Sequence, residues 1–238
     1  MTTPDSPVPA EVAERLAAVR ARIARAAARA GRPASSVTLI AVSKTYGPDH
    51  VRAAQAAGQA AFGENRVQEA LQKIAATTEL PIEWHLIGHL QSNKARKVVG
   101  PFALIHSIDS LALLERIDEA AGQRQVVQRV LVQVDLAQEA TKFGASIDET
   151  RTMLRATARL PHVRVEGLML IPPACDDPED ARPWFTQLRQ WRDRLVGEGL
   201  SASPLAELSM GMSHDVEVAI EEGATLVRVG SAIFGSRA

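Results

Sequence analysis

A lysine lies two residues beyond the end of a short apolar segment near the start of the sequence. Residues 37–42, VTLIAV, are apolar and rich in β-branched side chains, which is typical of a strand buried on both faces. The two-residue period of a strand places Lys44 on the face that carries Ile40 and Val42. An amine partly removed from water at that position has a lowered pKa and can form a Schiff base with an aldehyde. A solvated lysine that merely ends a strand is the alternative.

Two later segments combine glycine with serine and suit an anion. Residues 209–213, SMGMS, precede an expected helix, with Ser213 as its expected N-cap, and residues 228–232, RVGSA, follow the last expected strand. Backbone N–H groups at such positions, together with the serine hydroxyls, can bind phosphate. Each segment alone is more often just a turn or a helix cap, but the two together, after the last two expected strands, favour a phosphate site.

The other candidates rank lower. Lys73 fits the solvent face of a helix, Lys94 and Lys97 lie in a basic turn, and Lys142 is the only serious rival to Lys44. His85 could face inward, but it could equally be a core histidine. His89, His106 and His214 have no metal-ligand spacing, so we expect no metal site. Cys175 is the only cysteine, which excludes an intramolecular disulfide, and we expect it to be a bystander.

The order of the expected elements repeats strand and helix. Strands are expected at residues 37–42, 60–62, 83–87, 103–107, 129–134, 163–170, 206–209 and 226–229, and helices at residues 10–30, 48–58, 66–77, 93–99, 111–121, 148–160, 178–197 and 215–222. Eight such units predict a single (β/α)8 barrel of the TIM type, with parallel strands and right-handed crossovers. A doubly wound open sheet is the alternative, but no strand shows the polar face of an edge strand.

The domain organisation follows from this order. Residues 1–9 carry three prolines and are expected to be a flexible tail, and residues 10–238 form one domain. The first helix precedes the first strand, so it should lie outside the barrel or cover its bottom. In a barrel the active site lies at the carboxyl ends of the strands, where Lys44, Asn65, Met169, Ser209 and Arg228 are placed.

Composition narrows the class of function. The chain has 238 residues, 46% of them hydrophobic, and a net charge of −1, so no global field favours nucleic acid or a membrane. Few aromatic residues argue further against base stacking. No apolar segment is long enough to span a membrane, and residues 1–9 do not resemble a signal peptide. We therefore expect a soluble cytoplasmic protein, present as a monomer or weak dimer.

Six separated motifs resemble one known family. They are AVSKT (residues 41–45), FGEN (62–65), WHLIG with LQSNK (84–88 and 90–94), GLM (167–169), LSMGMS (208–213) and VRVGSAIFG (227–235). Their sequences and order are similar to those of the pyridoxal-phosphate homeostasis proteins, which are relatives of the N-terminal barrel of alanine racemase. The resemblance covers the chain from about residue 10 to its end.

The resemblance implies a cofactor, pyridoxal 5'-phosphate (PLP), and a set of residues that bind it. Lys44 would hold PLP as a Schiff base, and Ser209, Ser213, Gly230 and Ser231 would hold its phosphate. Arg228 would face the pyridine nitrogen. Asn65 and Met169 would line the pocket.

The family implies a carrier or reservoir in PLP homeostasis rather than an enzyme, with apo PLP-dependent enzymes as recipients. An arginine is always charged and only donates, so beside the pyridine nitrogen it weakens the ring as an electron sink. We also expect no second domain to supply the tyrosine base that racemases of this kind use. A weak amino-acid racemase is the alternative. A third possibility is a cofactor-free aldolase that uses Lys44 or Lys142.

Overall fold

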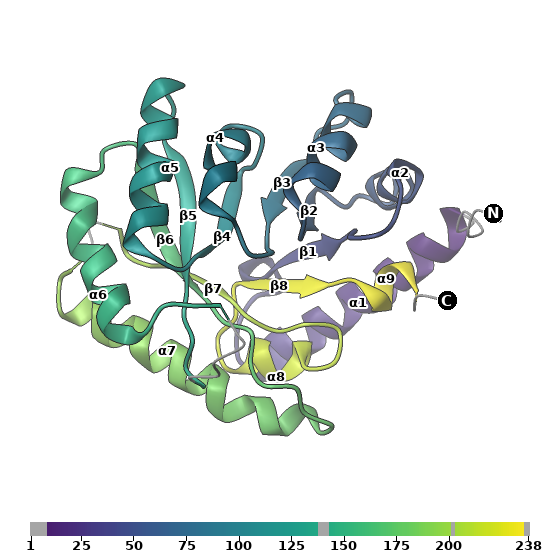
Figure 1. Cartoon of the computed structure of the whole chain (residues 1–238). Helices are drawn as coiled ribbons and strands as arrows, with labels where there is room; N and C mark the ends of the chain where they lie inside the picture. The colour runs from purple at the N-terminus through teal and green to yellow at the C-terminus, as the bar shows by residue number, and fades with distance from the viewer. Residues whose placement is uncertain (1–8, 138–142, 201–202, 236–238) are drawn as a thin grey trace.

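Eight parallel strands form a closed barrel in which spatial order equals chain order (Figure 1). The computed structural model describes residues 9–137, 143–200 and 203–235. The strands are β1 (Thr38–Val42), β2 (Ala61–Glu64), β3 (Glu83–Leu86), β4 (Leu104–Ile108), β5 (Gln128–Gln133), β6 (Val163–Met169), β7 (Glu207–Ser209) and β8 (Leu226–Val229). The predicted (β/α)8 barrel is confirmed, and the open-sheet alternative is wrong because β8 pairs with β1.

Helices connect and surround the strands. They are α1 (Pro9–Arg29), α2 (Pro48–Ala56), α3 (Val67–Ala76), α4 (Ala95–Val98), α5 (Leu111–Gln123), α6 (Ile147–Ala156), α7 (Arg182–Gly197), α8 (Val216–Glu221) and α9 (Ser231–Phe234). Short 3-10 turns adjoin several of them, at Ala34–Ser36, Ser92–Lys94, Thr157–Arg159 and Pro178–Ala181.

Some helix ends differ from the expectation. Ser213 does not cap α8, because the cap is Asp215, whose Oδ1 accepts a hydrogen bond of 2.6 Å from the backbone N–H of Met212. The sequence does not predict α9, since four residues give no periodic pattern. α1 begins at Pro9, and residues 1–8 of the expected tail lie outside the described residues.

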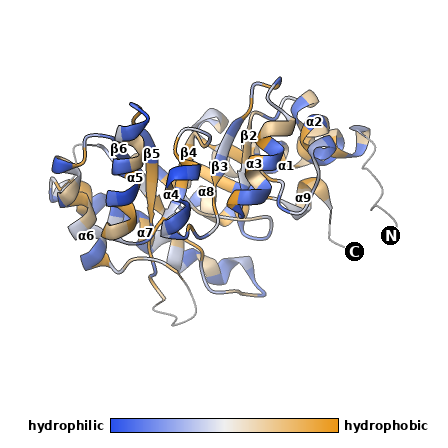
Figure 2. Cartoon of the chain, turned by 45° about the horizontal axis from the view of Figure 1, so that its top comes forward, coloured by the Kyte–Doolittle hydropathy of each residue, from blue (hydrophilic) through white to orange (hydrophobic). Residues whose placement is uncertain are grey.

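Two apolar layers result from the alternation along the strands. Ile40, Ala61, Leu104, Leu131, Met169 and Leu226 fill the barrel interior. Leu39, Ala41 and most other buried apolar residues lie between the strands and the helices. Figure 2 shows the strands largely orange and the outer helix surfaces mixed with blue. The predicted parity of β1, with Ile40 facing the interior, is confirmed, so Lys44 follows on the interior face.

α1 lies outside the barrel, alongside α8 (Figure 1). Its buried stripe includes Val12, Leu16, Val19 and Ile23. Two ion pairs join the helices, Arg22 Nε to Glu217 Oε1 at 2.6 Å and Arg29 Nε to Glu221 Oε1 at 2.8 Å. The added helix therefore covers the β8 side of the barrel and leaves the carboxyl ends of the strands open.

None of the helices in the described part of the chain is long and apolar enough to span a membrane. Within the same residues, no group of three or more His, Cys, Asp or Glu side chains could hold a metal ion.

Candidate functional site

A cavity of about 480 Å³ opens at the carboxyl ends of β1, β2 and β8. Lys44, Asn65, Arg228, Gly230 and Ser231 line it, as does Ser213 from the loop after β7. The remaining lining residues are Val42, Thr45, Tyr46, Ile87, Ile171, Met212, His214 and Gly235. Six of the eight predicted site residues thus meet in one cavity, of a size that suits a small-molecule ligand.

Strand pairing explains why these residues meet. β1 lies between β2 and β8, with Ala41 opposite Phe62 and Ile40 opposite Arg228. The ends of three adjacent strands therefore share one rim. Gly230 fits there because a Cβ would lie 3.1 Å from the carbonyl oxygen of Val42, which is a tight contact. A side chain at residue 230 would press β8 away from the strand that carries Lys44.

The charge of the cavity has one sign. Lys44 and Arg228 are cationic, and none of the described residues that line the cavity is Asp or Glu. Ser213 and Ser231 add hydroxyl groups close to the start of α9. The Oγ of Ser213 accepts from the backbone N–H of Gly230 at 3.4 Å, so its own hydrogen can donate to a ligand. The cavity therefore suits a small anion that carries an aldehyde.

Arg228 is held rigidly at the base of the cavity. Its side chain donates from Nη1 to Ser209 Oγ at 2.7 Å and from Nη2 to the carbonyl oxygen of Leu170 at 2.9 Å. Burial lowers the pKa of Arg228 to about 10, so the guanidinium stays charged at neutral pH. A guanidinium has five N–H donors, and these two contacts leave others for a ligand.

A chain of hydrogen bonds runs from Arg228 across the barrel interior. His106 Nδ1 lies 2.8 Å from Ser209 Oγ, and His106 Nε2 lies 2.9 Å from His85 Nδ1. Arginine can only donate, so Ser209 Oγ accepts from Arg228, and the direction of the next two hydrogen bonds depends on the tautomers of His106 and His85. Both histidines are neutral at neutral pH, because the pKa of each is lowered. Burial lowers the pKa of His85 to about 4, and burial together with His85 and Arg228 holds the pKa of His106 well below its usual value.

Two predicted site residues lie outside the cavity. Ser209 is fully buried, and its hydroxyl is engaged by Arg228 and His106, so the structure does not support its expected contact with a phosphate. Met169 is also fully buried and belongs to the apolar interior below the cavity, so it does not line the pocket as expected. Both side chains face the barrel interior and so lie beneath the rim.

Asn65 lies between the main cavity and two smaller ones. It lines all three, and its buried Oδ1 has no hydrogen-bond partner among the described residues. Gly88 leaves room for the backbone of Asn65, because a Cβ at residue 88 would lie 2.2 Å from the carbonyl oxygen of Asn65. An orphaned polar atom next to a cavity indicates a ligand group that donates to it.

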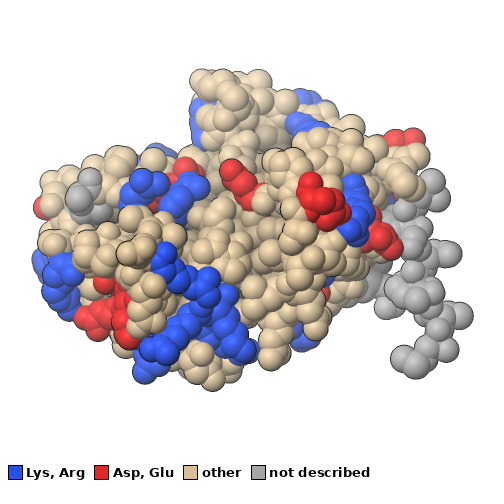
Figure 3. Space-filling model, turned by 90° about the horizontal axis from the view of Figure 1, so that it is seen from above, with Lys and Arg blue, Asp and Glu red and all other residues tan. Residues whose placement is uncertain are grey.

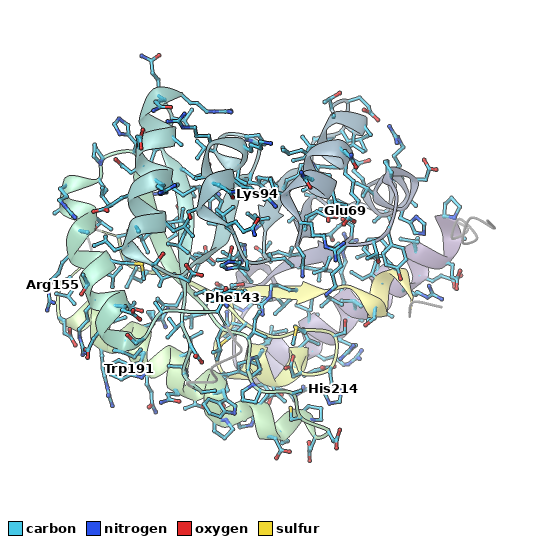
Figure 4. The ribbon with its side chains drawn as sticks, viewed as in Figure 1. Glu69, Lys94, Phe143, Arg155, Trp191 and His214 are labelled. Atoms are coloured by element: carbon cyan, nitrogen blue, oxygen red, sulfur yellow. The ribbon has the colours of Figure 1, made fainter. Side chains whose placement is uncertain are left out.

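One of the smaller cavities, about 320 Å³, adjoins the main one through Asn65, Ile87 and Ile171. His89 and Phe143 stack at its edge, with their ring centroids 3.6 Å apart. Figure 4 shows Phe143 near the centre of the molecule and His214 below it. The sequence assigns no role to His89 or to Tyr46, because loop residues of this kind carry no pattern that could reveal one.

The described lysines other than Lys44 lie outside the main cavity. Lys73 is buried, 5% exposed, so the expectation that it faces solvent is wrong. Lys94 is half-buried and Lys97 is exposed, and neither lines the main cavity. Lys142, the expected rival to Lys44, lies outside the described residues.

Comparisons with known proteins agree with this geometry. The family model for the N-terminal domain of alanine racemase matches residues 15–238. The chain therefore belongs to the class of proteins that contain this barrel domain. A pyridoxal phosphate homeostasis protein of Aquifex aeolicus is 46% identical over 224 residues, which cover 94% of this chain and 97% of that protein. The protein of the same name from Pseudomonas aeruginosa is 42% identical over 95% of this chain and 96% of its own length. The chain belongs to the pyridoxal phosphate homeostasis protein family.

Solved structures show the same fold. PipY of Synechococcus elongatus, solved with PLP bound, is 43% identical with a TM-score of 0.83, over 94% of this chain and 100% of that one. Alanine racemase of Corynebacterium glutamicum, at 18% identity and a TM-score of 0.74, shares the fold over 96% of this chain and 62% of that one.

Proposed function

We propose that this protein binds PLP through a Schiff base at Lys44 and acts as a reversible carrier of the cofactor in PLP homeostasis. The observation that carries the proposal is the placement of Lys44 in a cavity with Arg228, Ser213 and Ser231 and, among its described lining residues, without a carboxylate. The family relationship and the PLP-bound PipY structure support it. We expect it to act in the cytoplasm as a monomer or weak dimer, with apo PLP-dependent enzymes as recipients.

The residues present fit the cofactor. Ser213, Ser231 and the backbone around Gly230 would hold the phosphate at the start of α9, and the orphaned Asn65 Oδ1 would accept from a polar group of the ligand. When bound, PLP supplies an aldehyde that reacts with amines. Ser209 would not contact the cofactor, but its hydroxyl would orient the guanidinium of Arg228.

Arg228 favours storage over catalysis. It stays charged and can only donate, so it would hold the pyridine nitrogen of a bound PLP as an unprotonated acceptor. Removal of an amino-acid α-proton would gain little stabilisation under these conditions. His106 and His85, which contact Arg228 through Ser209, are neutral, so no imidazolium proton is present to reverse this arrangement.

The racemase alternative needs a second base opposite Lys44. Tyr46 lines the cavity, but its hydroxyl donates to the carbonyl oxygen of Gly235 at 2.7 Å, and its ring packs against Phe234. This contact directs the hydroxyl towards the chain around α9. The described part of the cavity therefore favours the carrier.

Release of the cofactor needs only another amine. The adjoining cavity of about 320 Å³, lined in part by Asn65, Gln133 and Asp135, gives a primary amine room next to the cavity of Lys44. Exchange replaces one Schiff base by another and consumes no further reactant.

Borohydride reduction followed by peptide mapping tests the proposed attachment. The wild-type protein with PLP should show an absorbance band at roughly 420 nm, typical of this cofactor as a Schiff base, and carry the reduced adduct on Lys44. K44A should lose both, while K97A, at an exposed lysine, should keep both. An adduct on Lys142 would overturn the assignment.

A second experiment separates the carrier from the racemase. The loaded protein is mixed with an apo PLP-dependent enzyme, and α-proton exchange of alanine and other amino acids is followed in heavy water. Transfer with slow exchange supports the carrier. Exchange with inversion at about 1 s⁻¹ or faster, an ordinary enzymatic rate, contradicts it and favours the racemase.

A further inference from the structure

A buried cluster of charges lies directly behind the turn that carries Lys44. Lys73 on α3 is 5% exposed, and Glu64 at the end of β2 is fully buried. The Lys73 Nζ donates to Glu64 Oε1 at 2.7 Å, to Glu69 Oε1 at 2.9 Å and to the carbonyl oxygen of Ser43 at 2.7 Å. An ammonium has three donors, so all three are used and the amine has one fixed position.

Both neighbours of Lys44 are bound to this cluster. The hydroxyl of Ser43 donates to Glu64 Oε1 at 2.6 Å, and the backbone N–H of Thr45 donates to Glu69 Oε1 at 2.7 Å. The carbonyl oxygen of Ser43 also accepts from the N–H of Tyr46 at 3.0 Å, which closes the turn. Together, Glu64, Lys73 and Glu69 hold the chain on either side of Lys44.

The turn needs such support. Thr45 has a φ of 72°, in the left-handed region that a β-branched residue rarely adopts. A conformation of this kind persists only where the surrounding structure imposes it. The hydrogen bond from Thr45 to Glu69 supplies a contact at the strained residue itself.

The cluster is also a costly way to fill space. Burial raises the pKa of the Glu64 carboxyl, against hydrogen bonds from Lys73 and Ser43, and Glu64 Oε2 has no hydrogen-bond partner in the described part of the chain. Apolar side chains of similar volume often give equal or greater stability than a buried ion pair. An apolar filling, however, could not bind the peptide groups of Ser43 and Thr45.

The three charged residues do not line the main cavity. Ser43 and Glu64 point outward from the barrel, towards α3, whereas Lys44 follows the inward parity of Ile40. Figure 4 shows Glu69 on α3, away from Phe143 at the centre of the molecule. The cluster can therefore affect a ligand only through the turn at residues 43–45.

We propose that Glu64, Lys73 and Glu69 are positioning residues that set the Ser43–Thr45 turn and thereby aim the Lys44 amine at the cofactor's aldehyde. The proposal rests on the proposed Schiff base at Lys44. The cluster should therefore affect the rate at which the Schiff base forms, and it should not affect the affinity for the ring and phosphate of the cofactor.

Two ligands separate these effects. PLP can react with Lys44, whereas 4-deoxypyridoxine 5'-phosphate has the same ring and phosphate but a methyl group in place of the aldehyde. E69A removes the acceptor of Thr45 at a side chain that is 26% exposed, E69Q restores an oxygen, and E79A removes a comparable surface partner of Arg52. The double variant E64Q/K73M tests the buried pair without leaving either of its two charges unpaired, should E69A fail to fold; Glu69, which also loses Lys73, is partly exposed.

E69A and E64Q/K73M should form the Schiff base about tenfold or more slowly in stopped-flow absorbance, since small displacements of a reacting group have effects of this size. The affinity of both variants for the deoxy analogue should equal that of the wild type. E69Q and E79A should equal the wild type both in the rate of Schiff-base formation and in the affinity for the analogue. An unchanged rate in both variants, or equal weakening of both ligands, would overturn the proposal. If the wild type itself forms no adduct on Lys44, the proposed function fails instead.

Discussion

Ser213 and Ser231 offer the most direct test of the anion site at the scale of single residues. Both line the cavity that also holds Lys44. The double variant S213A/S231A should weaken PLP far more than pyridoxal, because pyridoxal lacks the phosphate. Each lost hydrogen bond to the charged group should cost about 1.5–3 kcal/mol of binding free energy. Equal weakening of both ligands in equilibrium titrations would show that the serines serve the fold, and S36A, outside the cavity, is the control.

Ser209 should behave differently from that pair. It supports Arg228 from below, where its hydroxyl also contacts His106. S209A should therefore weaken PLP and pyridoxal by the same factor, because both ligands have the pyridine ring that we propose Arg228 faces. It should also lower the free energy of unfolding by about 1–3 kcal/mol in urea, since a buried donor loses its partner. A loss confined to PLP would restore Ser209 as a phosphate ligand.

Parity along a strand makes some of these residues predictable and leaves others hidden. Lys44 can be placed because Ile40 and Val42 fix the inward face of β1. The same rule applied to β4 places His106 on the interior face, two residues after Leu104. The sequence therefore does indicate that His106 faces inward, but a search for metal-ligand spacing alone does not detect it. Ser209 is the last residue of β7, as predicted, but its place next to the expected phosphate loop hides its contacts with Arg228 and His106 in the interior.

At the scale of elements, strands are easier to predict than helices and their ends. Strands buried on both faces are short continuous apolar segments, and all eight lie where the sequence predicts them. The burial of Lys73 is not predicted, although Val67, Ala70 and Lys73 lie three residues apart and share the buried stripe of α3. The reason is that the partners of Lys73 include residues of β2 and the turn after β1, and no pattern within α3 reveals them.

The contact of β6 with β7 depends on a glycine. A Cβ at residue 167 would lie 1.8 Å from the carbonyl oxygen of Glu207, so the two strands could not remain paired. G167A should lower the free energy of unfolding by about 3 kcal/mol or more in urea, as overpacked cores do.

Gly197 provides the matched control for that variant. It ends α7, and an added Cβ there would meet nothing within 4 Å. G197A should therefore be neutral or raise the free energy of unfolding by about 0.5–1 kcal/mol, as expected for alanine in a helix. Equal losses in G167A and G197A would contradict the close approach of β6 and β7.

For the molecule as a whole, the barrel interior divides into an apolar and a polar part. The apolar part includes Ile40, Leu131 and Met169, whereas the polar part is the hydrogen-bonded chain of His85, His106, Ser209 and Arg228. On the face shown in Figure 3, basic and acidic side chains form separate small groups on a largely uncharged surface. The most unusual electrostatics of the molecule are therefore internal.

This interior makes the stability of the whole fold depend on pH. His85 has a pKa of about 4 in the folded protein, lowered first by burial and then by the positive charge of Arg129 on β5, against 6.5 as the ordinary value. Between these two values the unfolded chain binds a proton that the folded chain does not. The free energy of unfolding therefore rises with pH in this window, and the contribution of His85 is lost as pH falls from about 6.5 to about 4.

Lowering the pH from 7.5 to 5 should reduce the free energy of unfolding by about 2 kcal/mol for each histidine with such a shift. Urea unfolding at the two pH values measures this loss. H85F should lose less stability than the wild type over this range, because one histidine of the hydrogen-bonded chain is gone, whereas H214A, at an exposed histidine, should follow the wild type. Most carboxylates titrate at lower pH, and Glu64, whose pKa is raised by burial, is present in all three proteins, so the difference between them isolates His85. The same pH dependence in H85F and in the wild type would show that His85 is protonated in the folded barrel. The neutral state of His85 in its contact with His106 would then be wrong.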